Sequence, residues 1–354
     1  MRIAVIGVGR NGHQFVRAYG ESPHVREIVI AEPSERLRRE YGGLPKVVKA
    51  YATGEEFFDE DGADVVSIHT PSGLHRGPFV EAARRGCHLF IEKPFAENLD
   101  DITAMVEAAA ANRGRAMAVG HNYRLESYSP QIKGLVEEGA LGDLVGIRAG
   151  YIADYIYQWV SEPPSVYNDP RAFITRRQAI LDGACHHIDL ANWWTGSRPV
   201  RVTSARRPME VEGHPTDWIA SLFQYDGGAL LHMDACWGAV VPHKPHFGIE
   251  IYGTRGSIRD GALHRFTSRE YHRQPYEAIP LRPVPEHGHS FDREAVMFLD
   301  AVVEGKAVPV TVGEGANAAA AAICAAESAR LGHPVEVPDF RRIAEGAGLS
   351  GRNL

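Results

Sequence analysis

The stretch LDGACHHIDLANWW, residues 181–194, combines residue types that can move protons. Asp182 and His186 are four residues apart, so a helix through this stretch would place both side chains on one face. A carboxylate there can orient the imidazole and support its protonated form, and the imidazole can take a proton from a hydroxyl group as a general base. The same residues also fit two other descriptions, a metal site and an ordinary buried helix.

Helical geometry opposes the metal site. His187 points roughly 100° away from His186 on a helix, so the two rings cannot readily share one ion, and Cys185 could join only with ligands from elsewhere in the chain. We therefore expect no metal. His187 is expected at the edge of a packed helix, Asp189 as a cap or a partner within the core, and Trp193 and Trp194 in packing.

Lys93 is the third candidate for proton chemistry. It stands in IEKP, directly after the buried stretch CHLFI, residues 87–91. Lysine is a compact cation with three donors, so beside a redox cofactor it can hydrogen-bond the reacting oxygen. Pro94 follows it, and the Lys93–Pro94 peptide can be cis or trans.

The beginning of the chain predicts where such a cofactor binds. RIAVIG, residues 2–7, is typical of a short buried strand, and residues 13–19 begin a helix. GVGRNG lies between them, and a GxGxxG loop between a strand and a helix is the fingerprint of dinucleotide binding. Its glycines allow a tight turn, an approach to the pyrophosphate and close packing of helix on strand, and the helix offers free N–H groups to the phosphates. The predicted cofactor contacts here are Gly7, Gly9, Arg10, Asn11 and Gly12.

The second strand, residues 27–31, ends at Glu32. This acid lies about 20 residues past the last glycine, where the fingerprint has a carboxylate for the ribose hydroxyl groups. A carboxylate also repels a 2′-phosphate, so NAD is favoured over NADP. Arg36, Arg38 and Arg39 follow closely, however, and an arginine there can accept NADP, which stays possible.

Strands alternate with helices through the first third of the chain. Strands are predicted at 64–69, 87–91 and 116–120 and helices at 54–59, 75–85 and 99–112, a pattern typical of a parallel sheet with right-handed crossovers. Ligands of such sheets bind at the carboxyl ends of the strands. The residues at those ends are Thr70, Pro71, Glu92, Lys93, His121 and Asn122, and His75 either joins them or only starts a helix.

Several motifs occur in an order that resembles the Gfo/Idh/MocA oxidoreductases, named after glucose–fructose oxidoreductase and inositol dehydrogenase. They are GVGRNG, TPSGLH, GCHLFIEKP, VGHNYR, the Asp182-x-x-x-His186 pair and YGTRGSI at 252–258. Ala184 stands where the family often has glycine. The resemblance runs from residue 1 to about residue 338.

The resemblance implies a fold and an activity. The fold is a Rossmann domain with a doubly wound parallel sheet (1–122), then an α+β domain on a large, mostly antiparallel sheet (123–340) and a tail (341–354). The activity is NAD(P)-dependent hydride transfer at a secondary alcohol of a sugar, inositol or related polyol. Two alternatives are a reductase of a non-sugar carbonyl or imine, and a cofactor-binding sensor without turnover. A homodimer or homotetramer formed through the open sheet face is also implied.

The resemblance also carries roles to particular residues. Lys93 would bind substrate and assist proton transfer, and Arg124 matches the family's arginine in NYR. We expect Lys93, Asp182 and His186 to be catalytic. The expected substrate contacts are these three with His121, Tyr123 and Tyr155, and the expected cofactor contacts also include Glu32, Thr70, Pro71, His75, Glu92, Lys93 and Asn122. Tyr155 is chosen because Tyr151, Tyr155, Tyr157 and Trp159 recur at multiples of two residues, which predicts an aromatic strand face.

Composition excludes other classes of protein. The net charge of −7, without a basic stripe, argues against a nucleic-acid partner. No stretch approaches the ~20 apolar residues of a membrane span. Four widely spaced cysteines without a CxxC motif fit a reducing compartment, so we expect a cytoplasmic protein with a small-molecule substrate.

Overall fold

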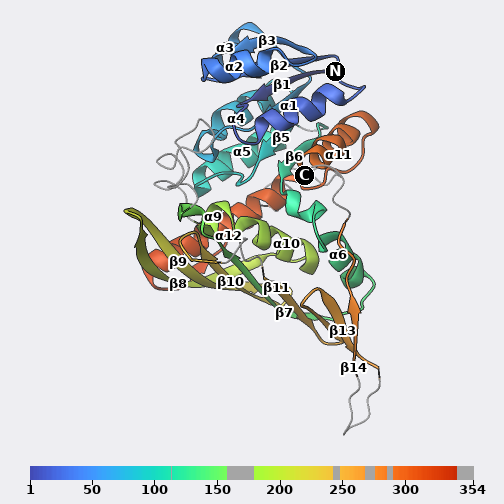
Figure 1. Ribbon diagram of the computed structural model, residues 1–354, viewed down its shortest axis with the longest axis vertical. Helices are drawn as coiled ribbons and strands as arrows, with labels where there is room; N and C mark the ends of the chain where they lie inside the picture. The colour runs from blue at the N-terminus through green and yellow to red at the C-terminus, as the bar shows by residue number, and fades with distance from the viewer. Residues whose placement is uncertain (113, 158–178, 242–247, 268–275, 285–289, 341–354) are drawn as a thin grey trace.

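The computed structural model describes residues 1–112, 114–157, 179–241, 248–267, 276–284 and 290–340. Two sheets organise them, one in the N-terminal third and one in the rest of the chain. Figure 1 shows the N-terminal sheet and its helices at one end of the molecule and the larger sheet at the other, with helices between them. The expected tail, 341–354, and Trp159 lie outside the described residues.

The first sheet has six parallel strands in the order β3-β2-β1-β4-β5-β6. This order is that of a Rossmann fold, with the crevice for a dinucleotide where the order reverses at β1 and β4. The prediction of a doubly wound parallel sheet is therefore confirmed, and β3 is a strand that the sequence did not reveal. The strands are β1 (Arg2–Ile6), β2 (Glu27–Ala31), β3 (Val47–Tyr51), β4 (Val65–Ile68), β5 (His88–Glu92) and β6 (Met117–Gly120).

Helices cover both faces of this sheet, and several begin at a side-chain cap. Ser34, Thr53 and Asn98 each accept a hydrogen bond from the backbone N–H three residues on, which satisfies one of the free donors of a first turn. The elements are α1 (Gly12–Glu21), α2 (Glu35–Gly42), α3 (Gly54–Glu60), the 3-10 turn η1 (Ser72–Leu74), α4 (Arg76–Arg84) and α5 (Leu99–Ala111). The turn η2 (Asn122–Leu125) and helix α6 (Ser129–Glu137) then lead to the second sheet.

The second sheet has nine strands in the order β14-β13-β12-β11-β7-β10-β9-β8-β15. Only β7 and β10 pair in parallel, so the predicted mostly antiparallel sheet is confirmed. The turns DGG and GTRG join antiparallel neighbours, β9 to β10 and β11 to β12. The strands are β7 (Leu144–Ile152), β8 (Pro199–Val211), β9 (His214–Tyr225), β10 (Leu230–Cys236), β11 (Ile249–Gly253), β12 (Gly256–Arg259), β13 (Ala262–Phe266), β14 (Tyr276–Pro280) and β15 (Val335–Glu336).

Three helices pack on one face of the second sheet (Figure 1): α9 (Ala179–Asp182), α10 (Cys185–Thr195) and α12 (Val312–Leu331). Their buried side chains meet Phe223, Met233 and other inward residues of alternate strand positions. The alanine run of α12 is buried on every side, because small side chains let α12 contact both sheets at once. No helix in the described ranges is long and apolar enough to cross a membrane.

One helix from late in the chain returns to the first sheet. α11 (Ser290–Glu304) packs against α1, and Phe298 meets Phe90 of β5 at a ring-centroid distance of 5.5 Å. The core beneath α1 therefore includes Ala295, Phe298 and Leu299. This long-range contribution was not expected from the sequence.

The predicted aromatic strand face is wrong. Strand β7 ends at Ile152, and residues 155–157 are helical. The hydroxyl groups of Tyr151 and Tyr155 are 3.4 Å apart, so these tyrosines meet around a bend and not along one pleat. Their spacing in multiples of two residues could not reveal where the strand ends.

Candidate functional site

The glycine loop between β1 and α1 is built for close approach. Gly7 has φ +86°, a conformation that side chains disfavour, and a Cβ there would lie 2.8 Å from the carbonyl oxygen of His69. A Cβ on Gly12 would lie 2.0 Å from the carbonyl oxygen of Gly7. Gly9, in contrast, has no atom within 4 Å of its Cβ position. The loop is closed against the protein and open at Gly9, beside Arg10 and Asn11, which is the space a pyrophosphate needs.

Glu32 lies at the end of β2 and turns back toward this loop. Its Oε2 accepts a hydrogen bond from the N–H of Val8 (3.0 Å), and its Oε1 accepts one from the N–H of Ser34 (2.9 Å). These bonds fix the carboxylate beside the glycine loop.

Each of the three nearby arginines already has a hydrogen-bond or ion-pair partner. Arg38 donates to the carbonyl oxygens of Glu32 and Pro33. Arg36 pairs with Glu40 and Arg39 with Glu35 along the exposed face of α2. Only Arg38 therefore lies beside the predicted ribose position.

The loop after β4 is held from inside. His75 is 1% exposed, and its ring nitrogens face the carbonyl oxygens of Phe95 (3.2 Å) and Thr70 (3.0 Å). The ring of His75 thus links the loop after β4 to the segment after Pro94. Thr70 Oγ1 is buried and has no hydrogen-bond partner among the described residues, so it is the group in this loop that a ligand could satisfy.

The two domains meet at Lys93. Lys93 Nζ donates to the carbonyl oxygen of Asp182 (3.0 Å) and lies 3.5 Å from Asp182 Oδ1. Both side chains are largely buried, at 16% and 15% exposure. The Lys93–Pro94 peptide is cis. The lysine predicted from the first domain and the aspartate predicted from the second are therefore brought together.

Asp182 and His186 do not share one helix, and that prediction is wrong. α9 ends at Asp182, the turn Gly183–Ala184 follows, and α10 begins at Cys185. A Cβ on Gly183 would lie 2.4 Å from the ring of Tyr151, so the chain passes this ring closely where the helix breaks. Asp182 is held by Lys93.

His186 is positioned by aromatic rings. It stacks on Tyr123 at 4.0 Å with an interplanar angle of 10°, and it meets the ring of His121 edge-on at 5.6 Å. Its Nδ1 is buried with no hydrogen-bond partner in the described part of the chain. Burial, followed by the charge of Lys93, lowers the pKa of His186 well below its ordinary value. The imidazole is therefore neutral at neutral pH and can accept a proton.

The other predicted contacts separate into two groups. Burial also lowers the pKa of His121, and this ring lies against His186, as does Tyr123. Asn122 turns away, because its amide donates to Glu126 (2.8 Å) and to Ser290 of α11 (2.9 Å). Tyr155 lies beside Tyr151, whose ring packs against His187.

A buried ion pair fixes the helix that carries His186. Arg124 donates through Nε and Nη2 to the two carboxylate oxygens of Asp189, at 2.8 and 2.7 Å, and through Nη1 to Glu314 at 2.9 Å. Asp189 is fully buried. Of the two expectations for Asp189, pairing within the core is the one observed. No local pattern indicates this partnership, because 65 residues separate Arg124 from Asp189.

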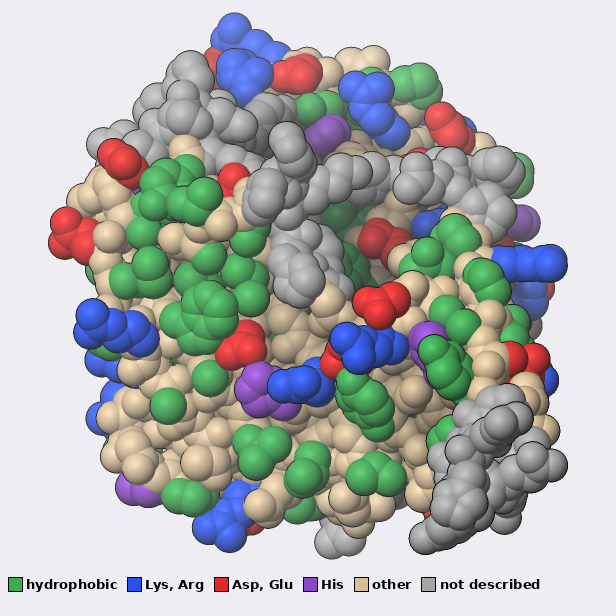
Figure 2. All heavy atoms as spheres, turned by 60° about the horizontal axis from the view of Figure 1, so that its bottom comes forward, with side chains coloured by type: hydrophobic (Ala, Val, Ile, Leu, Met, Phe, Trp, Pro, Cys, Tyr) green, Lys and Arg blue, Asp and Glu red, His purple; other side chains and the backbone are tan. Residues whose placement is uncertain are grey.

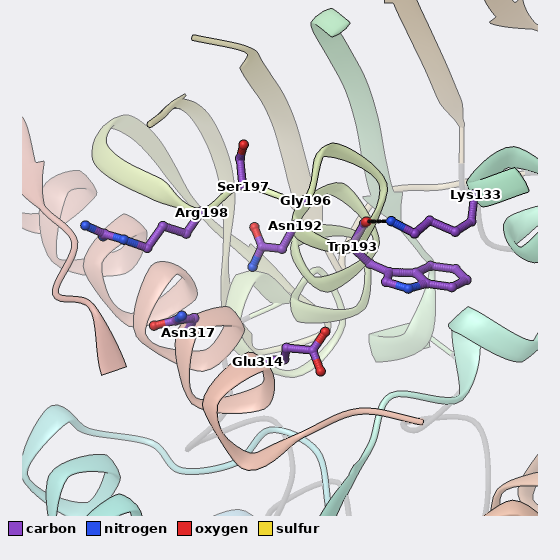
Figure 3. Close-up of a pocket in the computed structure, with 8 residues that line it drawn as sticks. All are labelled: Lys133, Asn192, Trp193, Gly196, Ser197, Arg198, Glu314 and Asn317. Carbon is purple, nitrogen blue, oxygen red and sulfur yellow. Dashed lines mark hydrogen bonds between the residues drawn. The ribbon is translucent and has the colours of Figure 1, made fainter. Parts of the chain in front are cut away.

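A polar pocket lies apart from these residues (Figure 3). It forms between α6, the end of α10 and the start of α12. Lys133 bonds the carbonyl oxygen of Trp193 there, Arg198 pairs with Asp339, and Glu314 pairs with Arg124. Lys133 also pairs with Glu137, so each of these charged groups has a partner of opposite charge. Elsewhere in the described ranges, no three His, Cys, Asp or Glu side chains gather as metal ligands.

Fold and site together define a two-domain protein with a dinucleotide crevice and a basic group at the domain junction. Residues 1–121 match the family model described as oxidoreductase family, NAD-binding Rossmann fold, and residues 130–259 match the GFO/IDH/MocA C-terminal domain. The chain belongs to the Gfo/Idh/MocA oxidoreductase family.

Relatives with assigned names are distant. The scyllo-inositol 2-dehydrogenase (NAD(+)) of Bacillus subtilis is 25% identical over 358 residues, covering 98% of both chains. A solved levoglucosan dehydrogenase, in complex with NADH and levoglucosan, is 25% identical with a TM-score of 0.77, covering 96% of this chain and 99% of that one. The 2,7-anhydro-N-acetylneuraminate hydratase of Mediterraneibacter gnavus is 22% identical over 367 residues, covering 93% of this chain and 94% of that protein.

Proposed function

We propose that this protein oxidises a secondary alcohol of a sugar, an inositol or a related polyol with NAD, or runs the reverse reduction. The observation that carries the proposal is the meeting of Lys93 from the Rossmann domain with Asp182 from the second domain, beside a neutral His186. Named relatives act on inositol and levoglucosan, which are polyols of this class.

The residues of the crevice fit NAD. Gly9 leaves room for the pyrophosphate, and Glu32 is fixed where it would bind the ribose hydroxyl groups. A 2′-phosphate would meet that carboxylate, and this favours NAD over NADP. Bound there, NAD supplies the hydride acceptor. Thr70 and Glu92 lie at the neighbouring strand ends and complete the proposed cofactor contacts.

The proton is handled by residues of both domains. His186 takes the hydroxyl proton as a general base, a role worth about 10²- to 10⁴-fold in rate. Lys93 donates a hydrogen bond to the same oxygen and stabilises the negative charge that develops on it. Asp182 holds the ammonium group of Lys93, while His121 and Tyr123 hold the imidazole of His186 by ring contacts.

The test is the absorbance of reduced nicotinamide with NAD or NADP and a panel of inositols, sugars, anhydrosugars and sugar acids. We expect one class of polyol to give a signal, with NAD preferred. No signal on the panel, together with NAD binding in calorimetry, would replace the proposal by another carbonyl or imine substrate or by a sensor. A failure to bind either dinucleotide would overturn the assignment of the glycine loop.

We also propose that the open face of the nine-stranded sheet joins two or four copies of the chain. This face, opposite α9, α10 and α12, mixes apolar and charged side chains (Figure 2), with Leu222 and Leu230 exposed by 41% and 42%. Leu222 and His232 are cross-strand neighbours on it. Sedimentation should give a dimer or tetramer, which Leu222→Lys should dissociate; a wild-type monomer would overturn this proposal.

A further inference from the structure

A buried chain of polar groups runs beneath the glycine loop and ends at Glu92, the residue before Lys93. The hydroxyl of Tyr19 lies 3.0 Å from Ser67 Oγ, and Ser67 Oγ lies 2.7 Å from His69 Nε2. On the other side of the ring, His69 Nδ1 lies 3.6 Å from Glu92 Oε1. None of these groups takes part in the proton transfer proposed above.

The spacing of serine, histidine and acid is that of a nucleophilic triad, but burial excludes this role. Ser67 is fully buried, as is the ring of His69, so no substrate can reach the serine. The ring is held between Phe15, at 4.3 Å, and Phe90, at 5.7 Å. These groups are therefore fixed in place, and they can influence the site at Lys93 only through their contacts within the protein.

The direction of these hydrogen bonds follows from Glu92, the acceptor at the end of this series of polar groups. Burial raises the pKa of Tyr19 well above its ordinary value, so its hydroxyl keeps its proton. A carboxylate such as that of Glu92 can only accept hydrogen bonds, so a hydrogen bond between the two residues requires the proton on Nδ1 of His69. Nε2 then accepts from Ser67, and Ser67 accepts from Tyr19.

Two atoms in this series of buried polar groups have no hydrogen-bond partner within the described residues. His69 Nδ1 and Glu92 Oε1 are both buried without a hydrogen bond within the described residues. Their separation of 3.6 Å exceeds a hydrogen bond by roughly 0.6 Å. Because buried polar groups are costly when unpaired and catalytic hydrogen bonds often tighten only on ligand binding, these two atoms are natural partners.

Glu294 of α11 lies near Glu92 and keeps its own proton. It is 3% exposed, and burial, followed by the nearby charge of Glu92, raises the pKa of Glu294 well above its ordinary value. Two buried carboxyl groups in one site do not readily ionise together. Glu294 is therefore neutral and does not draw the proton of His69 away from Glu92.

We propose that His69 is a positioning residue for the reaction: it donates from Nδ1 to Glu92 and so keeps this carboxylate away from Lys93. An unpaired buried carboxylate is attracted to the nearest cation, and Lys93 is adjacent in the chain. Capture by Glu92 would draw the ammonium group off Asp182 and off the reacting oxygen. The inference rests on the proposed function for its kinetic consequence but not for its hydrogen bond.

Two substitutions separate the two sides of the ring. The amide of asparagine can stand in for Nδ1, and that of glutamine for Nε2. His69→Asn therefore keeps a donor toward Glu92 and loses Ser67, whereas His69→Gln keeps Ser67 and loses the donor. We expect kcat to fall roughly 10- to 100-fold in His69→Gln, the effect of losing one hydrogen bond to a charged group, and less than threefold in His69→Asn, with the Kd for NAD changed little in both.

The kinetic result can contradict the proposal in two ways. Equal losses in both variants, or a larger loss in His69→Asn, would show that His69 acts through Ser67 or through packing alone. Unchanged kcat in both would show that Glu92 needs no donor. His88 lies at the start of β5, the strand that ends at Glu92. His88→Gln is therefore the matched control for a histidine substitution in the same domain.

A spectroscopic measurement decides the hydrogen bond without any turnover. In protein labelled with 15N-histidine and saturated with NAD, the Nδ1 proton of His69 should give an exchange-protected resonance far downfield of the amides. Glu92→Gln should move this resonance upfield, because a neutral amide is a weaker acceptor than a carboxylate. Absence of the resonance, or its persistence unchanged in Glu92→Gln, would overturn the proposal even if the substrate class were correct.

Discussion

His187 makes the protein sensitive to acid in a way that can be measured. Its ring is 2% exposed and packs edge-on against Tyr123 and Tyr151, each at a centroid distance of 5.8 Å. Burial lowers the pKa of His187 to about 4. The folded protein therefore resists protonation of this ring, while the unfolded chain accepts the proton near the ordinary value of about 6.5.

The sign follows from proton linkage. Between the unfolded and folded pKa values the unfolded state binds more protons, so the free energy of unfolding falls as the pH falls. With pKa values of about 6.5 unfolded and about 4 folded, the contribution of His187 is near zero at pH 7.5 and about −2 kcal/mol at pH 5. Below pH 4 the loss approaches about 3 kcal/mol and changes no further.

The assay compares urea unfolding of wild type and His187→Phe at pH 7.5 and pH 5. The variant keeps an aromatic ring against Tyr123 and Tyr151 and cannot titrate. His121 is present in both proteins, and His187 is only the last-named cause of the lowered pKa of His186, so the difference reports mainly on His187. His24→Phe is a surface control. We expect the variant to lose about 2 kcal/mol less than wild type on acidification. An equal loss in both proteins would refute the reasoning.

Three further predictions concern the cofactor, the ion pair and the base. Glu32→Gln should weaken NAD binding about tenfold in calorimetry, because it removes a charge-assisted bond to the ribose, and should narrow the preference over NADP; an unchanged Kd would place the ribose elsewhere. Arg124→Met should lower the free energy of unfolding by about 3–5 kcal/mol in urea, since Asp189 stays buried and charged, and Arg124→Met with Asp189→Leu should recover most of this; no recovery would assign the loss to packing. Because its pKa is lowered, His186 should remain an active base as the pH falls, so the acidic limb of kcat/KM should lie below pH of about 6.5; a limb at or above this value would assign the base elsewhere.

The Rossmann domain and its loop were predictable because their signals are local. GVGRNG lies between a strand and a helix, and each of its glycines has a backbone reason that spacing alone reveals. Glu32 was singled out by the same spacing, but its hydrogen bond from the N–H of Val8 was not predicted. Lys93 was predictable as a strand-end residue of a parallel sheet.

Long-range contacts decided what the sequence could not show. Asp182 and His186 have the spacing of one helix, yet Gly183 passes close to Tyr151 and Lys93 binds the carbonyl oxygen of Asp182, so the helix breaks between them. Tyr155 was placed on a strand that ends earlier. The packing of α11 on the first sheet includes the contact of Phe298 with Phe90. No local sequence pattern predicts this contact.

The positions of buried polar groups were equally hidden. His69 lies two residues beyond Ser67 in a predicted strand, and alternation places both on one face, but nothing local indicates Glu92 as the partner. Arg124 and Asp189 likewise belong to separate elements. Pairing of buried charges is set by the arrangement of elements, which the sequence specifies only through the whole fold.

The central claim is that a polyol transfers a hydride to NAD, with Lys93 bonded to the reacting oxygen and His186 as the base. The most direct test compares the rate of NADH formation by wild type and by Lys93→Met with the same polyol. The account predicts turnover in wild type and a loss of about 10²-fold or more in the variant, with NAD binding retained in calorimetry. Equal rates in the two proteins would contradict it, because the ammonium group would then have no part in the reaction.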